Sequence, residues 1–250
     1  MNILITGVTS GFGLAIAKLL AKDNHTIIGT GRRADKLAQI KTEIGDNFIP
    51  LCFDIGDLTA TQSALESLDK DILTNIDVLI NNAGLALGLE SADKADMNDW
   101  EQMINTNVLG LVNITNLILP YMVKNNNGLI INIGSTAGNY PYFGANVYGA
   151  SKAFVKQFSL NLRADLIGKK VRVTNIEPGL CGGTEFSNVR FKGDDEKVNK
   201  TYEKVDYIRP EDIANMVSYV INLPPHININ RLEVMPVAQT FAGLTVVKDM

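Results

Sequence analysis

Asn2-Ile3-Leu4-Ile5-Thr6-Gly7-Val8-Thr9-Ser10-Gly11-Phe12-Gly13 is a short apolar run that ends in a glycine-rich turn, and a helix-compatible segment, 14–22, follows it. Strand, glycine turn and helix in this order are the context that a dinucleotide-binding loop requires. Glycines let the backbone approach a pyrophosphate, which then lies at the helix N-terminus. The spacing is G-x-x-x-G-x-G and not the commoner G-x-G-x-x-G, so a plain strand-to-helix turn is the alternative. The turn residues that we predict to bind the cofactor are Gly7, Thr9, Ser10, Gly11, Phe12 and Gly13.

The composition is that of an ordinary globular protein, with 250 residues, of which 46% are hydrophobic and 20% charged. We find no repeat or linker, so we predict one α/β domain over 1–250. The net charge of -4 argues against nucleic acid or an anionic membrane as the partner, and no apolar run reaches the length of a membrane span. The chain lacks a signal peptide at its start and a disulfide framework, so we expect a cytoplasmic protein. His25 and His226 stand alone, and we expect no metal site.

The second predicted strand, 26–30, ends in Gly31-Arg32-Arg33. In dinucleotide folds this position meets the adenosine ribose, where an acid holds the 2′-hydroxyl of NAD and arginine accommodates the 2′-phosphate of NADP. Two arginines and no acid favour NADP as the cofactor, with a solvated helix start as the alternative.

The third predicted strand, 48–53, contains Pro50, which indicates the edge of a sheet, as in the strand order 3-2-1-4-5-6. Asp54 and Ile55 follow it at the carboxyl end, where ligands bind; Asp54 either meets the adenine or forms a turn. The fourth strand, 77–80, leads into Asn81-Asn82-Ala83-Gly84, which is not a common loop after a buried strand and which the family resemblance described below assigns to the cofactor site.

A long helix is predicted at about 98–123, and the polar Asn107 inside its apolar face is expected to perturb it; local capping or packing is the alternative. The next strand, 128–133, is a near-continuous apolar run, as expected when helices cover both faces of a sheet. It delivers Ser135 at its carboxyl end, where the hydroxyl can hydrogen-bond a substrate oxygen. A simple loop serine is the alternative.

Tyr148 and Lys152 are four residues apart, so on a helix both side chains share one face. A phenol titrates near pH 10, and a fixed ammonium nearby favours the phenolate and lowers that pKa. The pair suits a proton donor to a carbonyl or a base for an alcohol. A surface helix with an uninvolved tyrosine is the alternative, because this spacing arises by chance in many chains.

A strand at 171–176 precedes a long segment, 180–208, with few apolar residues. We predict that this segment is a substrate lid, because long loops in compact domains are usually functional or disordered. Its Arg190 is a candidate to bind a substrate carboxylate, with a surface charge as the alternative. We expect a helix opened by Pro210, a last strand at 229–235 and an irregular tail.

The pattern resembles the short-chain dehydrogenase/reductase family. The matching residues, in the family's order, are Thr6 to Gly13, Asn81 to Gly84, Asn107, Ser135, Tyr148, Lys152, Pro178 and Gly179. The resemblance implies a Rossmann-type doubly wound parallel sheet of about seven strands with helices on both faces. It also implies that Tyr148 is the general acid/base, that Ser135 orients the carbonyl, that Lys152 lowers the tyrosine pKa and holds the nicotinamide ribose, and that Asn107 supports a water-linked proton relay.

A narrower resemblance over nearly the whole length is to bacterial NADP-dependent 3-hydroxy acid dehydrogenases, a group also described as serine or L-allo-threonine dehydrogenases and similar to malonic semialdehyde reductases. It implies a homotetramer and a cofactor contact along 178–186. The residues of that contact are Pro178, Gly179, Leu180, Cys181, Gly182, Gly183, Thr184, Glu185 and Phe186. Cys181 departs from the group's pattern, and no argument makes it a nucleophile.

Three functions are compatible with these features. The first is an NADP-dependent oxidoreductase acting on the C3 hydroxyl or carbonyl of short 3-hydroxy acids. The second is a general carbonyl or 3-oxoacyl reductase of the same fold. The third is a dinucleotide-binding regulator without turnover, against which the combination of Ser135, Tyr148 and Lys152 speaks, because a sensor needs no proton relay. Fold alone does not exclude it.

Overall fold

Seven parallel strands form one sheet in the order β3-β2-β1-β4-β5-β6-β7 in the computed structural model, which describes residues 1–241. The strands are β1 (Asn2–Ile5), β2 (Thr26–Gly31), β3 (Phe48–Cys52), β4 (Ile76–Asn81), β5 (Gly128–Ile133), β6 (Val171–Pro178) and β7 (Arg231–Val234). Strands β1 and β4 are neighbours, so the order of the strands reverses between them. In an open α/β sheet, ligands bind outside the carboxyl ends of the strands at such a point. The predicted doubly wound sheet is confirmed.

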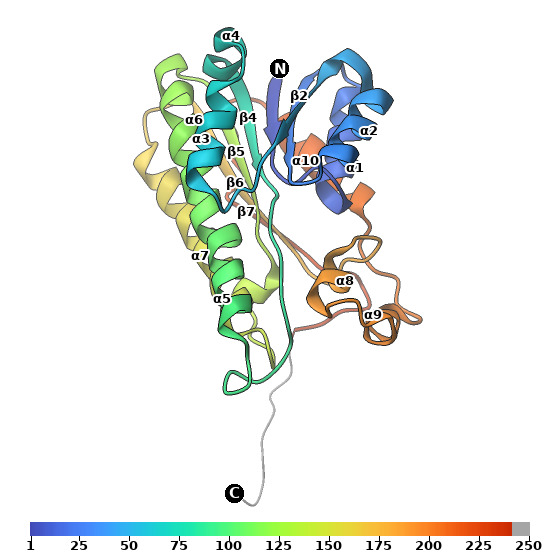
Figure 1. The fold of residues 1–250 in the computed structure, drawn as a ribbon. Helices are drawn as coiled ribbons and strands as arrows, with labels where there is room; N and C mark the ends of the chain where they lie inside the picture. Colours follow the sequence, from blue (N-terminus) through green and yellow to red (C-terminus); the bar gives the residue numbers. More distant parts are fainter. Residues whose placement is uncertain (242–250) are drawn as a thin grey trace, which may run out of the picture.

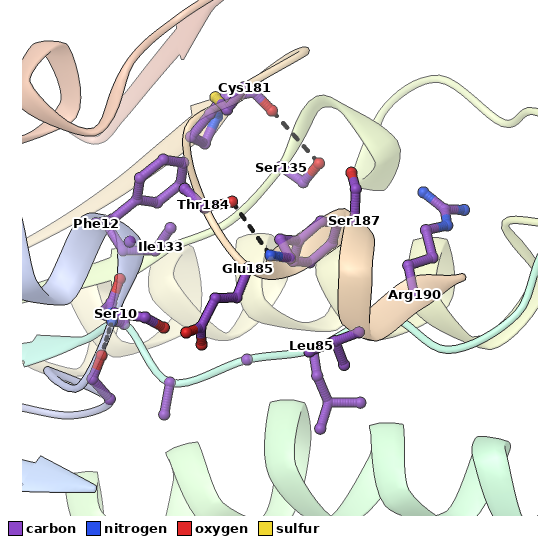
Figure 2. A pocket seen from close by; sticks show the side chains of 18 of the residues that line it. Ser10, Phe12, Leu85, Ile133, Ser135, Cys181, Thr184, Glu185, Ser187 and Arg190 are labelled. Carbon is purple, nitrogen blue, oxygen red and sulfur yellow. Dashed lines mark hydrogen bonds between the residues drawn. The ribbon is translucent and has the colours of Figure 1, made fainter. Parts of the chain in front are cut away.

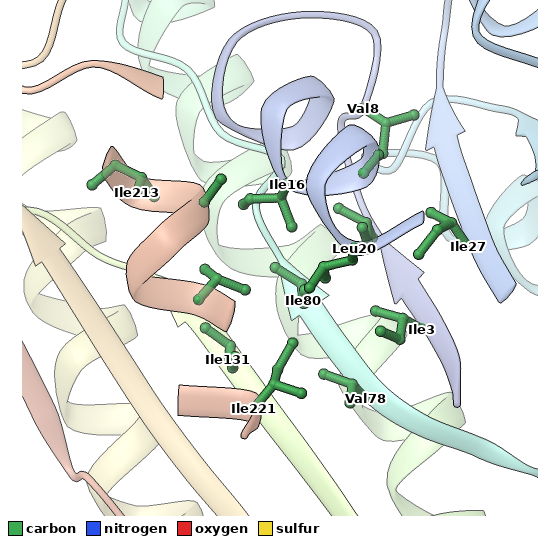
Figure 3. Packing of buried hydrophobic residues seen from close by; sticks show 14 of the residues in the cluster. Ile3, Val8, Ile16, Leu20, Ile27, Val78, Ile80, Ile131, Ile213 and Ile221 are labelled. Atoms are coloured by element: carbon green, nitrogen blue, oxygen red, sulfur yellow. The ribbon is translucent and has the colours of Figure 1, made fainter. Parts of the chain in front are cut away.

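Helices cover both faces of this sheet (Figure 1). On one face lie α1 (Gly11–Ala21), α2 (Ala34–Ile44) and α10 (Pro210–Ile221), and on the other α3 (Leu58–Glu66), α6 (Leu111–Asn125) and α7 (Asn146–Asp165). Alternate residues of a strand point to opposite faces. Ile3 of β1 therefore belongs to one buried cluster with Ile16 of α1 and Ile213 of α10, which Figure 3 shows, whereas Leu4 belongs to the cluster that contains Ile114 of α6.

Shorter helical pieces connect these layers. They are α4 (Lys70–Thr74), α5 (Met97–Ile104), α8 (Phe186–Arg190) and α9 (Asp195–Tyr202), with single 3-10 turns at Gly45–Asn47 and Thr136–Gly138. Helices α8 and α9 lie within the predicted lid, so 180–208 is not the unstructured loop that its composition suggested. Asp194 caps α9 by accepting a hydrogen bond from the backbone N–H of Lys197, which explains how so polar a segment forms a helix.

The edge position of β3 is confirmed by its pairing with β2 alone. Pro50 lies opposite Gly29 of β2, and because proline has no N–H to donate, an outermost strand tolerates it best. The last strand is shorter than predicted, since β7 covers only Arg231–Val234. The irregular tail expected after 235 lies partly outside the described residues.

The long helix predicted for 98–123 is interrupted, as expected from Asn107. A π-helical turn, Asn105–Gly110, separates α5 from α6 and contains the buried Asn107. Such single wide turns in helices are frequent at functional sites.

The combined helical stretch Met97–Asn125 is, contrary to our expectation, long and apolar enough to span a membrane by length and composition. One such helix is a weak indication, because the core helix of a globular domain has the same properties. Here Ile114 and Ile118 are fully buried in the core beside the sheet.

Candidate active site

A cavity of about 560 Å³ lies at the carboxyl ends of the strands, where the strand order reverses. Its walls are the glycine turn after β1, the loops after β2 to β6 and the segment 180–208. Most of the predicted site residues lie in these walls, including Ser135, Tyr148, Lys152 and Arg190. Within residues 1–241, no group of three or more His, Cys, Asp or Glu side chains could hold a metal ion.

Helix α7 brings Tyr148 and Lys152 onto one face, one turn apart. Both are almost completely buried, with exposed fractions of 8% and 6%. The Lys152 ammonium lies 5.9 Å from the centre of the Tyr148 ring and donates a hydrogen bond of 2.8 Å to the Ile133 carbonyl at the end of β5. The helix and the strand end thus fix both groups with respect to each other.

Burial dominates the protonation of this pair. It raises the pKa of Tyr148, to which the nearby Tyr142 adds, while a hydrogen bond with Ser135 and the charge of Arg190 lower it. Burial also lowers the pKa of Lys152 to about 8. Burial therefore outweighs the neighbouring charges at Tyr148 in this structure, and the expected lowering of its pKa by Lys152 stays a prediction.

Ser135 begins the 3-10 turn that follows β5, and its side-chain oxygen caps this turn by accepting from the Ala137 N–H at 3.1 Å. Its hydroxyl lies 3.4 Å from the Pro178 carbonyl at the end of β6. The serine is therefore held between two strand ends and directed at the cavity that Tyr148 lines. This is the position that a group orienting a carbonyl oxygen needs.

Asn107 does not line the cavity but lies behind its wall. Its side chain donates to the Leu85 carbonyl and accepts from the Leu85 N–H, at 2.8 and 2.9 Å, and also donates to Ser151 at 3.1 Å. A Cβ atom placed on Gly84 would lie 3.3 Å from the Asn107 oxygen and 3.4 Å from the Lys152 nitrogen. Asn107 thus joins the π-helical turn to the loop beside Lys152, and its part in a proton relay stays a prediction.

The glycine turn has a shape that side chains would block. Gly7 and Gly11 have φ angles of 73° and 54°, in the left-handed region that favours glycine. A Cβ on Gly13 would lie 2.3 Å from the Gly7 carbonyl oxygen, so Gly13 serves the close packing of α1 on the turn and does not line the cavity. The exposed backbone and the start of α1 fit a pyrophosphate.

The two asparagines after β4 have different surroundings. Asn82 lines the cavity and donates to the carbonyls of Thr6 and Gly7 at 2.8 and 3.0 Å, which ties this loop to the glycine turn. Asn81 points into the protein and donates to Thr115 and Asn132. The period of two along the strand turns the Asn81 side chain to the helix-covered face, away from the cavity, and a cofactor contact by Asn81 stays a prediction.

Both arginines after β2 line the cavity, and each contacts an acid. Arg32 lies 3.4 Å from Asp54, which also accepts from the Gly56 N–H and so forms the turn that was its alternative assignment. Arg33 contacts Thr9 and, across the cavity, Glu185 at 2.9 Å. No acid follows β2 directly in the sequence, but two acids from later segments, Asp54 and Glu185, lie beside the two arginines. Ile55, Ala83 and Gly84 also lie in the wall.

Along 178–186, seven of the nine predicted residues line the cavity, namely Pro178, Gly179, Leu180, Cys181, Thr184, Glu185 and Phe186. Gly182 does not, because it packs against the Tyr207 ring, and Gly183 lies against Pro210 with a φ of 69°. Burial raises the pKa of the Cys181 thiol to about 12, which agrees with the view that Cys181 is no nucleophile.

Arg190, at the end of α8, reaches the catalytic end of the cavity. Its guanidinium carbon lies 5.4 Å from the centre of the Tyr142 ring and 5.7 Å from that of Tyr148. It donates to the Tyr142 hydroxyl at 3.0 Å and, through Nε, to the Gly88 carbonyl at 3.4 Å. Figure 2 shows Arg190 and Glu185 on opposite sides of α8, with Ser135 above it.

Among the cavity residues that the sequence analysis missed, Tyr142 and Gln239 hold other cavity residues in place. Tyr142 positions Arg190, and the run Tyr140-Pro141-Tyr142-Phe143 just before Gly144 could have drawn attention to it. Gln239 lines the cavity and accepts from the Leu180 N–H at 2.6 Å. No local signal marks Gln239, because its role depends on how the chain returns after β7.

Residues 1–195 match the family model for short chain dehydrogenase. The chain belongs to the short-chain dehydrogenase family. The resemblance of Tyr148, Lys152 and the glycine turn to that family is thus confirmed at the level of the family.

Three relatives are similar over nearly their full lengths. A probable NADP-dependent dehydrogenase of Haemophilus influenzae is 62% identical over 98% of this chain and 97% of its own. The NADP-dependent 3-hydroxy acid dehydrogenase YdfG of Escherichia coli is 56% identical over 98% and 99%. The closed form of serine dehydrogenase complexed with NADP+ has a TM-score of 0.97 and 55% identity, with 100% of both chains covered.

Proposed function

We propose that this protein is an NADP-dependent oxidoreductase that transfers a hydride between NADP(H) and the C3 hydroxyl or carbonyl of short 3-hydroxy acids, such as serine, L-allo-threonine or 3-hydroxypropionate. The observation that carries the substrate class is the guanidinium of Arg190, 5.7 Å from the Tyr148 ring in one cavity. A proton-transfer group and a cation within a few ångströms suit a small molecule with a hydroxyl and a carboxylate. The activities of the relatives support this class.

Each residue of the site has its own role in the proposed reaction. The cofactor, when bound, supplies or accepts the hydride. Tyr148 donates its phenolic proton to the carbonyl oxygen in reduction and takes the hydroxyl proton back in oxidation. Ser135 hydrogen-bonds the same oxygen. Lys152, in the wall of the cavity, would hold the nicotinamide ribose of the cofactor. Burial of Tyr148 and Lys152 excludes water from the step and strengthens these contacts.

We also propose that 180–208 is a lid of a single domain. Its contacts to the rest of the chain support this role, since Arg190 binds Gly88 and Lys192 lies 2.8 Å from Asp99 of α5. A homotetramer is proposed from the family resemblance alone, and a cytoplasmic location from the low cysteine count. Sedimentation of the purified protein tests the oligomeric state.

The test of the substrate class is the variant Arg190→Met. If Arg190 binds the carboxylate, KM for 3-hydroxy acids should rise about tenfold or more, while KM for alcohols without a carboxylate should stay unchanged. Because Arg190 also lowers the pKa of Tyr148, a change in kcat is expected for both substrate types and is not the readout. A matched control is Arg163→Met, because Arg163 lies near the end of α7, outside the cavity. An equal rise in KM for both substrate types would reject the carboxylate role. High activity of the unmodified protein on uncharged carbonyl compounds would favour the general carbonyl reductase instead.

A further inference from the structure

Glu185 joins the lid to the arginine at the adenosine end of the cavity. It directly precedes α8, and its two carboxylate oxygens lie 3.1 Å from Nη1 and 2.9 Å from Nη2 of Arg33. The first contact is a hydrogen bond and the second an ion-pair contact, so both terminal nitrogens face the carboxylate, as they would face a phosphate. Figure 2 shows Glu185 extending from α8 towards Ser10 of the glycine turn.

The remaining donors of Arg33 bind Thr9. Nε and Nη2 donate to the Thr9 hydroxyl at 3.3 and 3.1 Å, and Nη2 also donates to the Thr9 carbonyl at 3.1 Å. Every nitrogen of the guanidinium therefore has an acceptor from the protein. Nη1 has two N–H groups and a single acceptor, Glu185, so an anion could bind one N–H without displacing anything. An anion that binds Arg33 in a bidentate manner has to share the other donors or displace the acceptor that is easiest to move.

Glu185 is that acceptor. The Thr9 contacts include the backbone of the glycine turn, which is fixed by the fold, whereas the Glu185 side chain is 53% exposed and that of Arg33 38%. Hydrogen bonds from Arg33 and Ser10 lower the pKa of Glu185, so the carboxylate is charged at neutral pH. A phosphate monoester that approached Arg33 would meet this negative charge at close range.

We infer that Glu185 competes with the 2′-phosphate of the cofactor for Arg33 and thereby limits the preference for NADP over NAD. The inference rests on the proposed binding of that phosphate by Arg33. The cost of the competition falls on a phosphate-bearing cofactor alone, because NAD carries a hydroxyl at this position and leaves the pair of Glu185 and Arg33 undisturbed. Glu185 is therefore a specificity-determining residue within the lid.

The test compares two probes that lack nicotinamide, 2′,5′-ADP and 5′-AMP, by isothermal titration calorimetry. Glu185→Gln keeps the size of the side chain and removes its charge. We expect the Kd of 2′,5′-ADP to fall about three- to fivefold, the scale of an exposed ion pair, and that of 5′-AMP to stay unchanged. The effect should shrink at high salt.

Two further variants make the outcome specific. Glu203→Gln removes the same charge from the same segment, where Glu203 pairs with Lys204 and does not line the cavity, and it should leave both Kd values unchanged. In an Arg33→Ala background, the gain from Glu185→Gln should disappear. An equal gain there, or an equal gain from Glu203→Gln, would show a general charge effect and overturn the competition.

Failure of the inference differs from failure of the proposed phosphate site. If Arg33→Ala leaves the Kd of 2′,5′-ADP unchanged, Arg33 does not bind the phosphate, and the basis of the inference is lost. If Arg33→Ala weakens 2′,5′-ADP but Glu185→Gln does not tighten it, the phosphate site holds and Glu185 has no part in specificity.

Discussion

The guanidinium carbon of Arg190 lies 5.7 Å from the centre of the Tyr148 ring, although α8 and α7 carry these residues in separate parts of the chain. The cation lowers the pKa of Tyr148, against the larger effect of burial. Arg190, from the segment 180–208, therefore acts on the electrostatics of Tyr148 and lines the same cavity.

Replacement of Tyr148 by phenylalanine should abolish turnover and spare cofactor binding. The ring and its packing against Phe186 remain, but the transferable proton is lost. General acid/base catalysis contributes about 10²–10⁴-fold, so kcat should fall by at least a hundredfold while the Kd of NADPH, measured by fluorescence, stays within about twofold. Turnover near the wild-type rate would remove Tyr148 from the mechanism.

The free protein should show Tyr148 as a neutral phenol well into the alkaline range. Because burial raises its pKa above the ordinary value of about 10, the proton is retained at every pH below that value. The ultraviolet difference spectrum between the wild type and Tyr148→Phe, recorded as pH rises, isolates this residue from the other tyrosines. A phenolate signal near neutral pH would contradict the dominance of burial.

Replacing both Arg32 and Arg33 by alanine should reduce the preference for NADP over NAD. Each guanidinium is already beside a carboxylate, so phosphate binding exchanges one ion pair for another, and we expect a loss of about tenfold in NADP affinity. The affinity for NAD should change little. Titration of both cofactors measures the ratio, and an unchanged ratio would show that the phosphate binds elsewhere.

Arg231→Met should destabilise the fold by about 3 kcal/mol. Arg231 of β7 makes two hydrogen bonds, of 2.8 and 2.7 Å, to the fully buried Glu177 of β6, and removing one partner leaves a buried charge. Burial raises the pKa of Glu177, but hydrogen bonds from Arg231 and Asn139 outweigh it and hold the pKa below its ordinary value.

Urea unfolding at pH 7 measures the loss. The charged form of Glu177 is the stabilising one, so the difference between Arg231→Met and the wild type should diminish as pH falls through the lowered pKa of this carboxyl. Glu233→Gln serves as the control, since Glu233 lies 3.6 Å from Arg231 and is partly exposed, and it should cost less than about 1 kcal/mol. A loss of that small size for Arg231→Met would mean that water hydrates Glu177.

Local sequence patterns were sufficient for the sheet and for the reacting pair. Strands, tight turns and edge positions depend mainly on residues that are close in sequence. The apolar runs therefore predicted the strands, the glycine turn predicted the turn before α1, and Pro50 predicted the edge position of β3. Tyr148 and Lys152 are one helical turn apart, and the helix alone places them together. Asn107 predicted the interruption between α5 and α6, because a polar side chain within an apolar helix face needs hydrogen-bond partners, here the Leu85 backbone.

Contacts between distant segments could not be predicted, because they depend on how α8 folds back over the strand ends. The sequence gives no reason for Glu185 to meet Arg33, for Arg190 to meet Tyr142 or for Gln239 to meet Leu180. The protonation of Tyr148 was decided in the same way. A lysine at helical spacing predicts a lowered pKa, but the burial of both groups by the assembled domain determines the direction of the shift.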